Sequence, residues 1–473
     1  MVRRVPRPPR PAASQDPRRG GRRIVERMDA PVPVLEPVLP RRGQRRGPAA
    51  PAIALPAVAF VMGCLALSGD TREPARSPWL AVVDPSGALV TMDAAGGTIE
   101  SIDAPGVTFQ FPAWSPDGSH IAAIGGSRSF GAVYVLDAAA ATEPGDDGRT
   151  VLYTSPDQRP FYLSWSPDSE RVSFLTNEAS GGIALRTAPA DAAEPAEVVR
   201  RAAPFYWDWI DPGRLIVHTG GSGPESFIGE VGLDGTALET SSIEPGFFRS
   251  PTVAAGGRYR AYVATARGTD QAIVLEARGA SVRHEIPVTG SIAISFAPAG
   301  PRLAFVASDR EVAEPPPLPI GPLRVVNAES GAVTILRDGP VVAFFWSPDG
   351  RAIALLEFIE SEGPAVEEAR IGPAMLAAAV AEPRGVALRL AFVDVASGAV
   401  RSERDVRVTE LFAFQLLPFF DQYALSHRVW SPDSDAIVLP VAGDGGLDQV
   451  AVIPIDGSAP RLVADGSMAF WRP

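Results

Sequence analysis

The sequence predicts an all-β protein folded as a β-propeller of eight four-stranded blades, with seven blades as the alternative. Three observations lead to this prediction. A Trp-Ser-Pro-Asp phrase ending in Gly or Ser occurs four times, each copy precedes a short apolar run, and weaker copies continue the pattern. The four phrases begin at Trp114, Trp165, Trp346 and Trp430.

The weaker copies keep the spacing of the phrase. In the copies at 209, 253 and 296, the aromatic or apolar anchor is followed by Gly four residues later and then by apolar residues. The copy at 471 contains only the first half of the pattern. All anchors together fall at positions 114, 165, 209, 253, 296, 346, 430 and 471. Most intervals are in the forties, which is the length of one four-stranded blade. The propeller has seven blades instead if one of the weak copies is an insertion that lies outside the ring.

Each part of the phrase has a physical role. In Ser-Pro-Asp-Gly, Pro sets φ, Asp can accept a hydrogen bond from its own backbone, and Gly takes a positive φ, so the phrase predicts a tight turn. The preceding Trp can pack between neighbouring blades. The apolar run after the turn, such as 121–124, predicts a strand covered on both faces.

The two ends of the repeat region predict how the ring closes. Residues 79–104 contain three strand-like runs with no inner strand before them, and Met468–Trp471 reads as an inner strand with nothing after it. We therefore expect one blade to be shared by N- and C-terminal strands, which leaves only short, protected sheet edges.

These phrases resemble the TolB-type, WD40-like β-propeller repeat of bacterial proteins, which is also found in the propeller domains of prolyl oligopeptidases and dipeptidyl peptidases. The resemblance covers 78–473. The peptidases of that group carry a hydrolase domain with a Gly-x-Ser-x-Gly nucleophile turn. This sequence has no such motif, so we expect a propeller without a hydrolase domain and without peptidase activity.

The N-terminal segment 1–47 has a different composition. It contains 13 Arg, four acidic residues and many Pro, and is predicted to be disordered. Its formal charge of +9 leaves −21 on the rest of the chain, which carries no Lys. So acidic a propeller is not expected to bind nucleic acid.

An uncharged segment, 48–68, is predicted to be a signal or membrane anchor, and 69–77 a linker. Its length suffices to span a bilayer, and the Arg-rich side should stay in the cytoplasm. Val61-Met-Gly-Cys64 resembles a bacterial lipobox, with Cys64 as the lipidated residue, although Met62 departs from the usual small residue. The alternatives are an uncleaved anchor, or plain secretion with a start at Met28 rather than Met1. The propeller is expected to be extracytoplasmic and attached to the cell membrane or envelope.

Residues suited to catalysis are sparse. The four histidines, at 120, 218, 284 and 427, form no local metal motif. A central channel could still gather them from different blades. The recurring acids Asp117, Asp168, Asp349 and Asp433 could be calcium ligands, or part of turns. We expect no catalytic residue, metal or cofactor.

One face of the predicted propeller carries three long insertions, 309–322, 360–385 and 411–426. We predict that this is the binding face, because loops on a rigid scaffold commonly hold function. The starts of several inner strands, on the same face, bring aromatic pairs. These pairs either line a funnel mouth or pack between blades, and the 411–420 run could also fold down as a lid. The candidate binding residues are Phe161, Tyr162, Phe205, Tyr206, Phe247, Phe248, Phe412, Phe414, Phe419 and Phe420.

The favoured function is a membrane-tethered, non-catalytic module that binds a protein or peptide, with a monomeric propeller. The alternative is a lyase or glycan-processing enzyme with a site in the central channel. A third possibility is a structural or sensory ectodomain whose Arg-rich arm meets a cytoplasmic partner or anionic lipid.

Overall fold

A computed structural model describes residues 80–473 except 94–95, 103–105, 139–147, 180, 222–225, 241–244, 247–248, 267–268, 280–282, 309–317, 360–384 and 444–445. The chain divides into two compact units, Met1–Asp70 and Thr71–Pro473, and every described residue belongs to the second. The expectations for 1–47, 48–68, 69–77 and Cys64 therefore lie outside the described residues.

The described part is almost entirely β-structure, with a 3-10 turn, Ala255–Gly257, and one longer helical segment near its end. The strands are β1 (Leu80–Val83), β2 (Leu89–Met92), β3 (Thr98–Ile102), β4 (Thr108–Trp114), β5 (His120–Gly126), β6 (Gly131–Asp137), β7 (Arg149–Ser155), β8 (Pro160–Trp165), β9 (Arg171–Asn177), β10 (Ile183–Pro189), β11 (Glu197–Ala202), β12 (Phe205–Asp211), β13 (Arg214–Thr219), β14 (Phe227–Gly232), β15 (Ala237–Thr240), β16 (Thr252–Val253), β17 (Tyr259–Ala266), β18 (Thr269–Ala277), β19 (Arg283–Val288), β20 (Ile292–Phe296), β21 (Arg302–Ala307), β22 (Gly321–Asn327), β23 (Val333–Trp346), β24 (Ala352–Phe358), β25 (Val386–Asp394), β26 (Val400–Val408), β27 (Ala436–Ala442), β28 (Asp448–Pro454), β29 (Arg461–Asp465) and β30 (Met468–Trp471).

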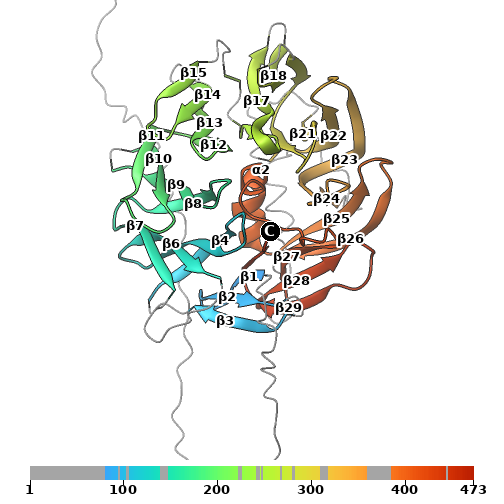
Figure 1. Ribbon diagram of the computed structural model, residues 1–473. Helices are drawn as coiled ribbons and strands as arrows, with labels where there is room; N and C mark the ends of the chain where they lie inside the picture. The colour runs from blue at the N-terminus through green and yellow to red at the C-terminus, as the bar shows by residue number, and fades with distance from the viewer. Residues whose placement is uncertain are drawn as a thin grey trace, which may run out of the picture. The chain divides into compact units, whose positions relative to one another are not determined.

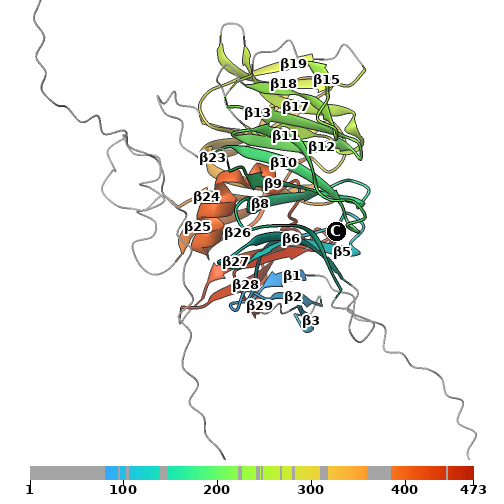
Figure 2. The same cartoon turned by 90° about the vertical axis from the view of Figure 1, so that its left-hand side faces the viewer.

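These strands form the eight blades of a propeller, as the spacing of the anchors predicts. Figure 1 shows the sheets following one another around a ring, and Figure 2 shows the same sheets from the side. Blade 1 is β30-β1-β2-β3, and blades 2 to 5 are the consecutive quartets β4–β7, β8–β11, β12–β15 and β16–β19. Blades 6 to 8 are joined into one continuous ten-stranded sheet, β20 to β29. The joins arise because β23 runs from the outer edge of blade 6 to the inner edge of blade 7, and because Val408 of β26 pairs with Val441 of β27.

The ring is closed by both ends of the described chain, which confirms the predicted closure. Strand β30 pairs antiparallel with β1, from Leu80 opposite Trp471 to Val83 opposite Met468. All four residues of each strand are buried. The closing blade is thus held by a buried sheet ladder in addition to side-chain packing.

The Trp anchors join successive blades by a repeated hydrogen bond. The indole N–H of Trp165 donates to the carbonyl of Ala113, the residue before the preceding anchor, at 2.9 Å. Trp114, Trp346 and Trp430 donate in the same way to Phe470, Ser295 and Phe345. These side chains therefore combine apolar burial with a satisfied polar group at the seams between blades.

Blade 8 departs from the four-stranded plan. Its inner strand is reduced to a single bridge between Trp430 and Ile437. The chain that would extend this inner strand upstream forms helical turns instead: a π-helical turn, Phe412–Leu416, a 3-10 turn, Leu417–Phe419, and the short helix α2, Phe420–Tyr423. The expected insertion at 411–426 is therefore a helical plug, a name we use for residues 411–427.

Candidate functional site

The plug lies inside the ring, where it contacts the inner strands of several blades. Figure 1 shows α2 within the circle of sheets. Phe420 packs edge-on against Phe344 and Phe345 of blade 7, with ring centroids 5.2 and 5.8 Å apart. On the other side, Tyr423 stacks on Phe111 of blade 2 at 5.1 Å. The plug fills the end of the ring at which the inner strands begin.

Gln422 is the polar centre of the plug. Its Nε2 donates to the carbonyl of Trp207 at 2.9 Å, and its Oε1 accepts the N–H of Trp207 at 3.3 Å. The Oε1 also accepts the hydroxyl of Ser250 at 3.3 Å, while the hydroxyl of Tyr162 donates to the Gln422 carbonyl at 2.7 Å. The Nε2 of Gln422 also donates to the Tyr162 hydroxyl at 3.1 Å. Because inner strands present an unpaired backbone edge, this one amide side chain satisfies groups from blades 3, 4 and 5.

His427 ends the plug and is buried. Its Nε2 lies 3.1 Å from the carbonyl of Phe111, and its Nδ1 lies 2.6 Å from the hydroxyl of Ser426. The ring is 4.7 Å from that of Phe470, on the closing strand. Burial lowers the pKa of His427 to about 4, so the imidazole is neutral at physiological pH.

Two acids lie beside this cluster, the buried Asp421 and the half-buried Asp208. Burial raises the pKa of Asp421 to about 6, although the charge of Arg249 and the N–H groups of Gln422 and Ile294 act against the increase. Burial likewise raises the pKa of Asp208 to about 7, against hydrogen bonds from the N–H groups of Val253 and Trp209. The carboxyl of Asp208 links blades 4 and 5, and that of Asp421 links the plug to blade 6.

Of the eight predicted binding aromatics that the structure describes, four are buried packing residues. Phe247 and Phe248 lie outside the described residues. Tyr162, Phe205, Phe412 and Phe420 are buried, and Tyr206 is half-buried against Phe419, with ring centroids 6.5 Å apart. Three are exposed to solvent: Phe161 at 37 %, Phe414 at 43 % and Phe419 at 45 %. We call Phe161, Tyr206, Phe414 and Phe419 the aromatic patch.

The aromatic patch belongs to the face that the plug closes. Phe161 precedes Tyr162, whose hydroxyl bonds the plug, so the two side chains of β8 point in opposite directions. Phe414 and Phe419 extend from the outer side of the plug, while Phe412 and Phe420 fill the inner side. Phe414 and Phe419 share the plug, and Tyr206 contacts Phe419. Exposed aromatics on such a rigid element are typical of interaction surfaces.

The recurring acids lie on the face opposite the plug, and three of the four are turn residues. Asp117, Asp168 and Asp349 accept the hydroxyl of the Ser two residues earlier, at 2.6, 2.5 and 2.6 Å, and then a backbone N–H. Within the described residues, no group of three or more His, Cys, Asp or Glu is arranged to hold a metal ion. His120, His218 and His284 lie on three different blades.

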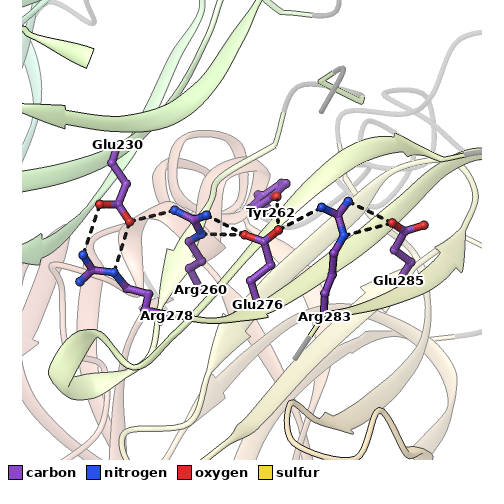
Figure 3. A network of polar contacts seen from close by, with 7 residues as sticks. All are labelled: Glu230, Arg260, Tyr262, Glu276, Arg278, Arg283 and Glu285. Carbon is purple, nitrogen blue, oxygen red and sulfur yellow. Dashed lines mark hydrogen bonds and ion pairs between the residues drawn. The ribbon is translucent and has the colours of Figure 1, made fainter. Parts of the chain in front are cut away.

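A chain of ion pairs joins blades 4 and 5 near their outer strands (Figure 3). Glu230 of β14, buried, contacts Arg260 at 2.8 Å and Arg278 at 3.3 Å. Arg260 also binds Glu276 at 2.8 Å, which in turn pairs with Arg283. Because Glu230 and Glu276 each meet at least two guanidinium groups, the network joins the blades rather than presenting a free charge.

Sequence reasoning located the plug but missed Gln422, Asp421 and Asp208. The available signal is the Asp421-Gln422 pair directly after the apolar run 411–420. Polar residues following such a run are usually read as its end. Only the ring of inner strands around them turns these side chains into buried partners.

Comparison with known proteins shows the fold alone. No protein-family model matches the sequence, and no curated protein matches it. The dihydro-heme d1 dehydrogenase NirN is 12 % identical with a TM-score of 0.50, over 84 % of this chain and 75 % of that one. The C-terminal WD40 domain of Sif2 is 12 % identical, with a TM-score of 0.49 over 80 % and 94 %. TolB from Acinetobacter baumannii is 18 % identical, with a TM-score of 0.34 over 55 % and 63 %.

Proposed function

We propose that this propeller is a non-catalytic module that binds a protein or peptide through the aromatic patch. The observation that carries the proposal is that the plug leaves Phe414 and Phe419 exposed on a segment whose other side is fixed to the inner strands. A rigidly held aromatic loses little conformational entropy when a partner covers it. The expected occupant is an extended protein segment with apolar side chains.

The proposal includes tethering outside the cytoplasm through the segment 48–68, with Cys64 as the lipid-bearing residue. Its support is the sequence of that segment. In the described residues, no helix is both long and apolar enough to cross a membrane. Labelled palmitate should be incorporated into the wild type and not into Cys64→Ser. Equal labelling of both proteins would contradict lipidation at Cys64.

Site-specific photocross-linking in native membranes tests the binding proposal. A benzophenone side chain would replace Phe414 or Phe419 in the full chain. The matched control would carry it at Val151, which is 48 % exposed on the outer strand β7. We expect one cross-linked protein from the two plug positions and none from position 151.

Competition decides whether that product is specific. Unlabelled wild type should reduce the yield, whereas the variant Phe161→Ser, Phe414→Ser, Phe419→Ser should not. Binding at the aromatic patch would be refuted if both proteins reduced the yield of the product equally. It would also be refuted if positions 414 and 419 gave no product.

The alternative, an enzyme that uses the channel, is favoured by one observation. Asp208 and Asp421 both have a raised pKa, and such carboxyls often occur at catalytic sites. Both also accept backbone N–H groups that join blades or fix the plug, which is a structural role. The binding proposal is preferred because the plug occupies the mouth of the channel beside them.

A further inference from the structure

A groove lies between blades 8 and 1, on the face opposite the plug. Its volume is about 390 Å³. Its lining includes Asp433 and Asp435 from the last Ser-Pro-Asp turn, Val452 and Pro454 from β28, Arg461 and Trp471. Two residues here break the pattern that the other repeats follow, and both belong to this groove.

Asp433 is the first departure. In the other three phrases the Ser hydroxyl donates to the Asp of the same turn. In the fourth, the hydroxyl of Ser431 donates to Asp435 instead, at 2.6 Å. Asp433 is left exposed, with no hydrogen-bond or ion-pair partner in the described part of the chain. A carboxylate released from its turn is available to a ligand.

Trp471 is the second departure. Four anchor indoles donate to the carbonyl of the residue before the preceding anchor. For Trp471 that residue is Val429, and the indole makes no hydrogen bond to its carbonyl. The side chain of Trp471 is 4 % exposed, and its Nε1 has no acceptor among the described residues. A buried donor without an acceptor is costly, and its occurrence beside a groove calls for an explanation.

We propose that this groove binds an arginine side chain of a partner peptide. The guanidinium would pair with Asp433 and the outer oxygen of Asp435, since the lining holds two carboxylates against one guanidinium, that of Arg461. The aliphatic stem would lie on Val452, Pro454 and the ring of Trp471. A backbone carbonyl of the peptide is the acceptor chemistry that the Trp471 indole lacks. This site is separate from the aromatic patch and does not depend on it.

Fluorine NMR of the full-length chain, labelled with 5-fluorotryptophan in nonionic detergent, tests the proposal. The probe is N-acetyl-arginine methylamide at constant ionic strength, with the uncharged citrulline analogue as its control. The signal of Trp471 is assigned with Trp471→Phe. Trp430, whose indole bonds Phe345, serves as the internal reference.

We expect the arginine probe to shift the Trp471 signal saturably and to leave that of Trp430 in place. Asp433→Asn should weaken this binding about fivefold or more, because one of two charge-assisted contacts is lost. Asp168→Asn, the same change in a turn of blade 3, should leave it unchanged. An equal response to citrulline, no response at tens of millimolar probe, or equal binding by wild type and Asp433→Asn would overturn the proposal.

Discussion

The backbone N–H of Asp117 donates a 3.1 Å hydrogen bond to the hydroxyl oxygen of Ser169, across the seam between blades 2 and 3. Asp349 and Ser434 repeat this contact at 3.1 Å between blades 7 and 8. Both Ser residues have a positive φ, at 66° and 59°, where Gly would be less strained. The hydroxyl explains why two phrases end in Ser rather than Gly.

Ser169→Ala is expected to destabilise the protein by about 1 kcal/mol, because the strained φ remains while the hydrogen bond is lost. Ser169→Gly should be close to neutral, since relief of strain offsets that loss. Urea unfolding of both variants measures the difference. Equal stabilities for the Ala and Gly variants would show that the backbone at this position is not strained.

Gln422→Ala should cost about 3 kcal/mol, because the N–H and carbonyl of Trp207 lose their partner inside the ring. Gln110→Ala, at an exposed position of β4, is the control and should change stability little. The midpoint of chemical unfolding reports both. A loss below about 0.5 kcal/mol for Gln422→Ala would mean that water replaces the amide there.

Asp421→Asn should become progressively more stable than the wild type as pH rises from 4 to 7. The pKa of Asp421 is raised from 3.8 to about 6 in the folded protein, so its contribution to stability is complete below the unfolded value and is lost as the pH rises through the folded value. The shift corresponds to a pH-dependent gain of about 3 kcal/mol for the variant. Unfolding free energies of both proteins should be compared at each pH. His218 and His427, whose lowered pKa acts in the opposite sense, are common to both and cancel. A pH-independent difference would mean that Asp421 ionises normally.

Removal of residues 467–473 should lower the unfolding free energy by about 5 kcal/mol or more, because Phe470 and Trp471 are buried and β30 completes blade 1. Removal of Arg472 and Pro473 alone is the matched control and should have a small effect. Thermal melting distinguishes the two truncations. An unchanged melting temperature for the longer truncation would contradict closure by β30.

The sequence by itself determined the propeller and its closure, and favoured eight blades over seven. Those features follow from local chemistry that recurs: Trp114 and its equivalents, the Pro and Asp of each turn, and the apolar runs that follow. A turn or a strand needs only near neighbours in the sequence, so each copy could be read without the others.

Only the tertiary structure decided what the apolar run at 411–420 does and which aromatics are free. Gln422 lies 215 positions from Trp207, and His427 lies 316 from Phe111. Sequence spacing carries no information on such pairs, because the ring brings them together only once every blade is in place. The same holds for Asp433 and Trp471. Each has the same residue type as its equivalents in other repeats but lacks the hydrogen bond that those equivalents make.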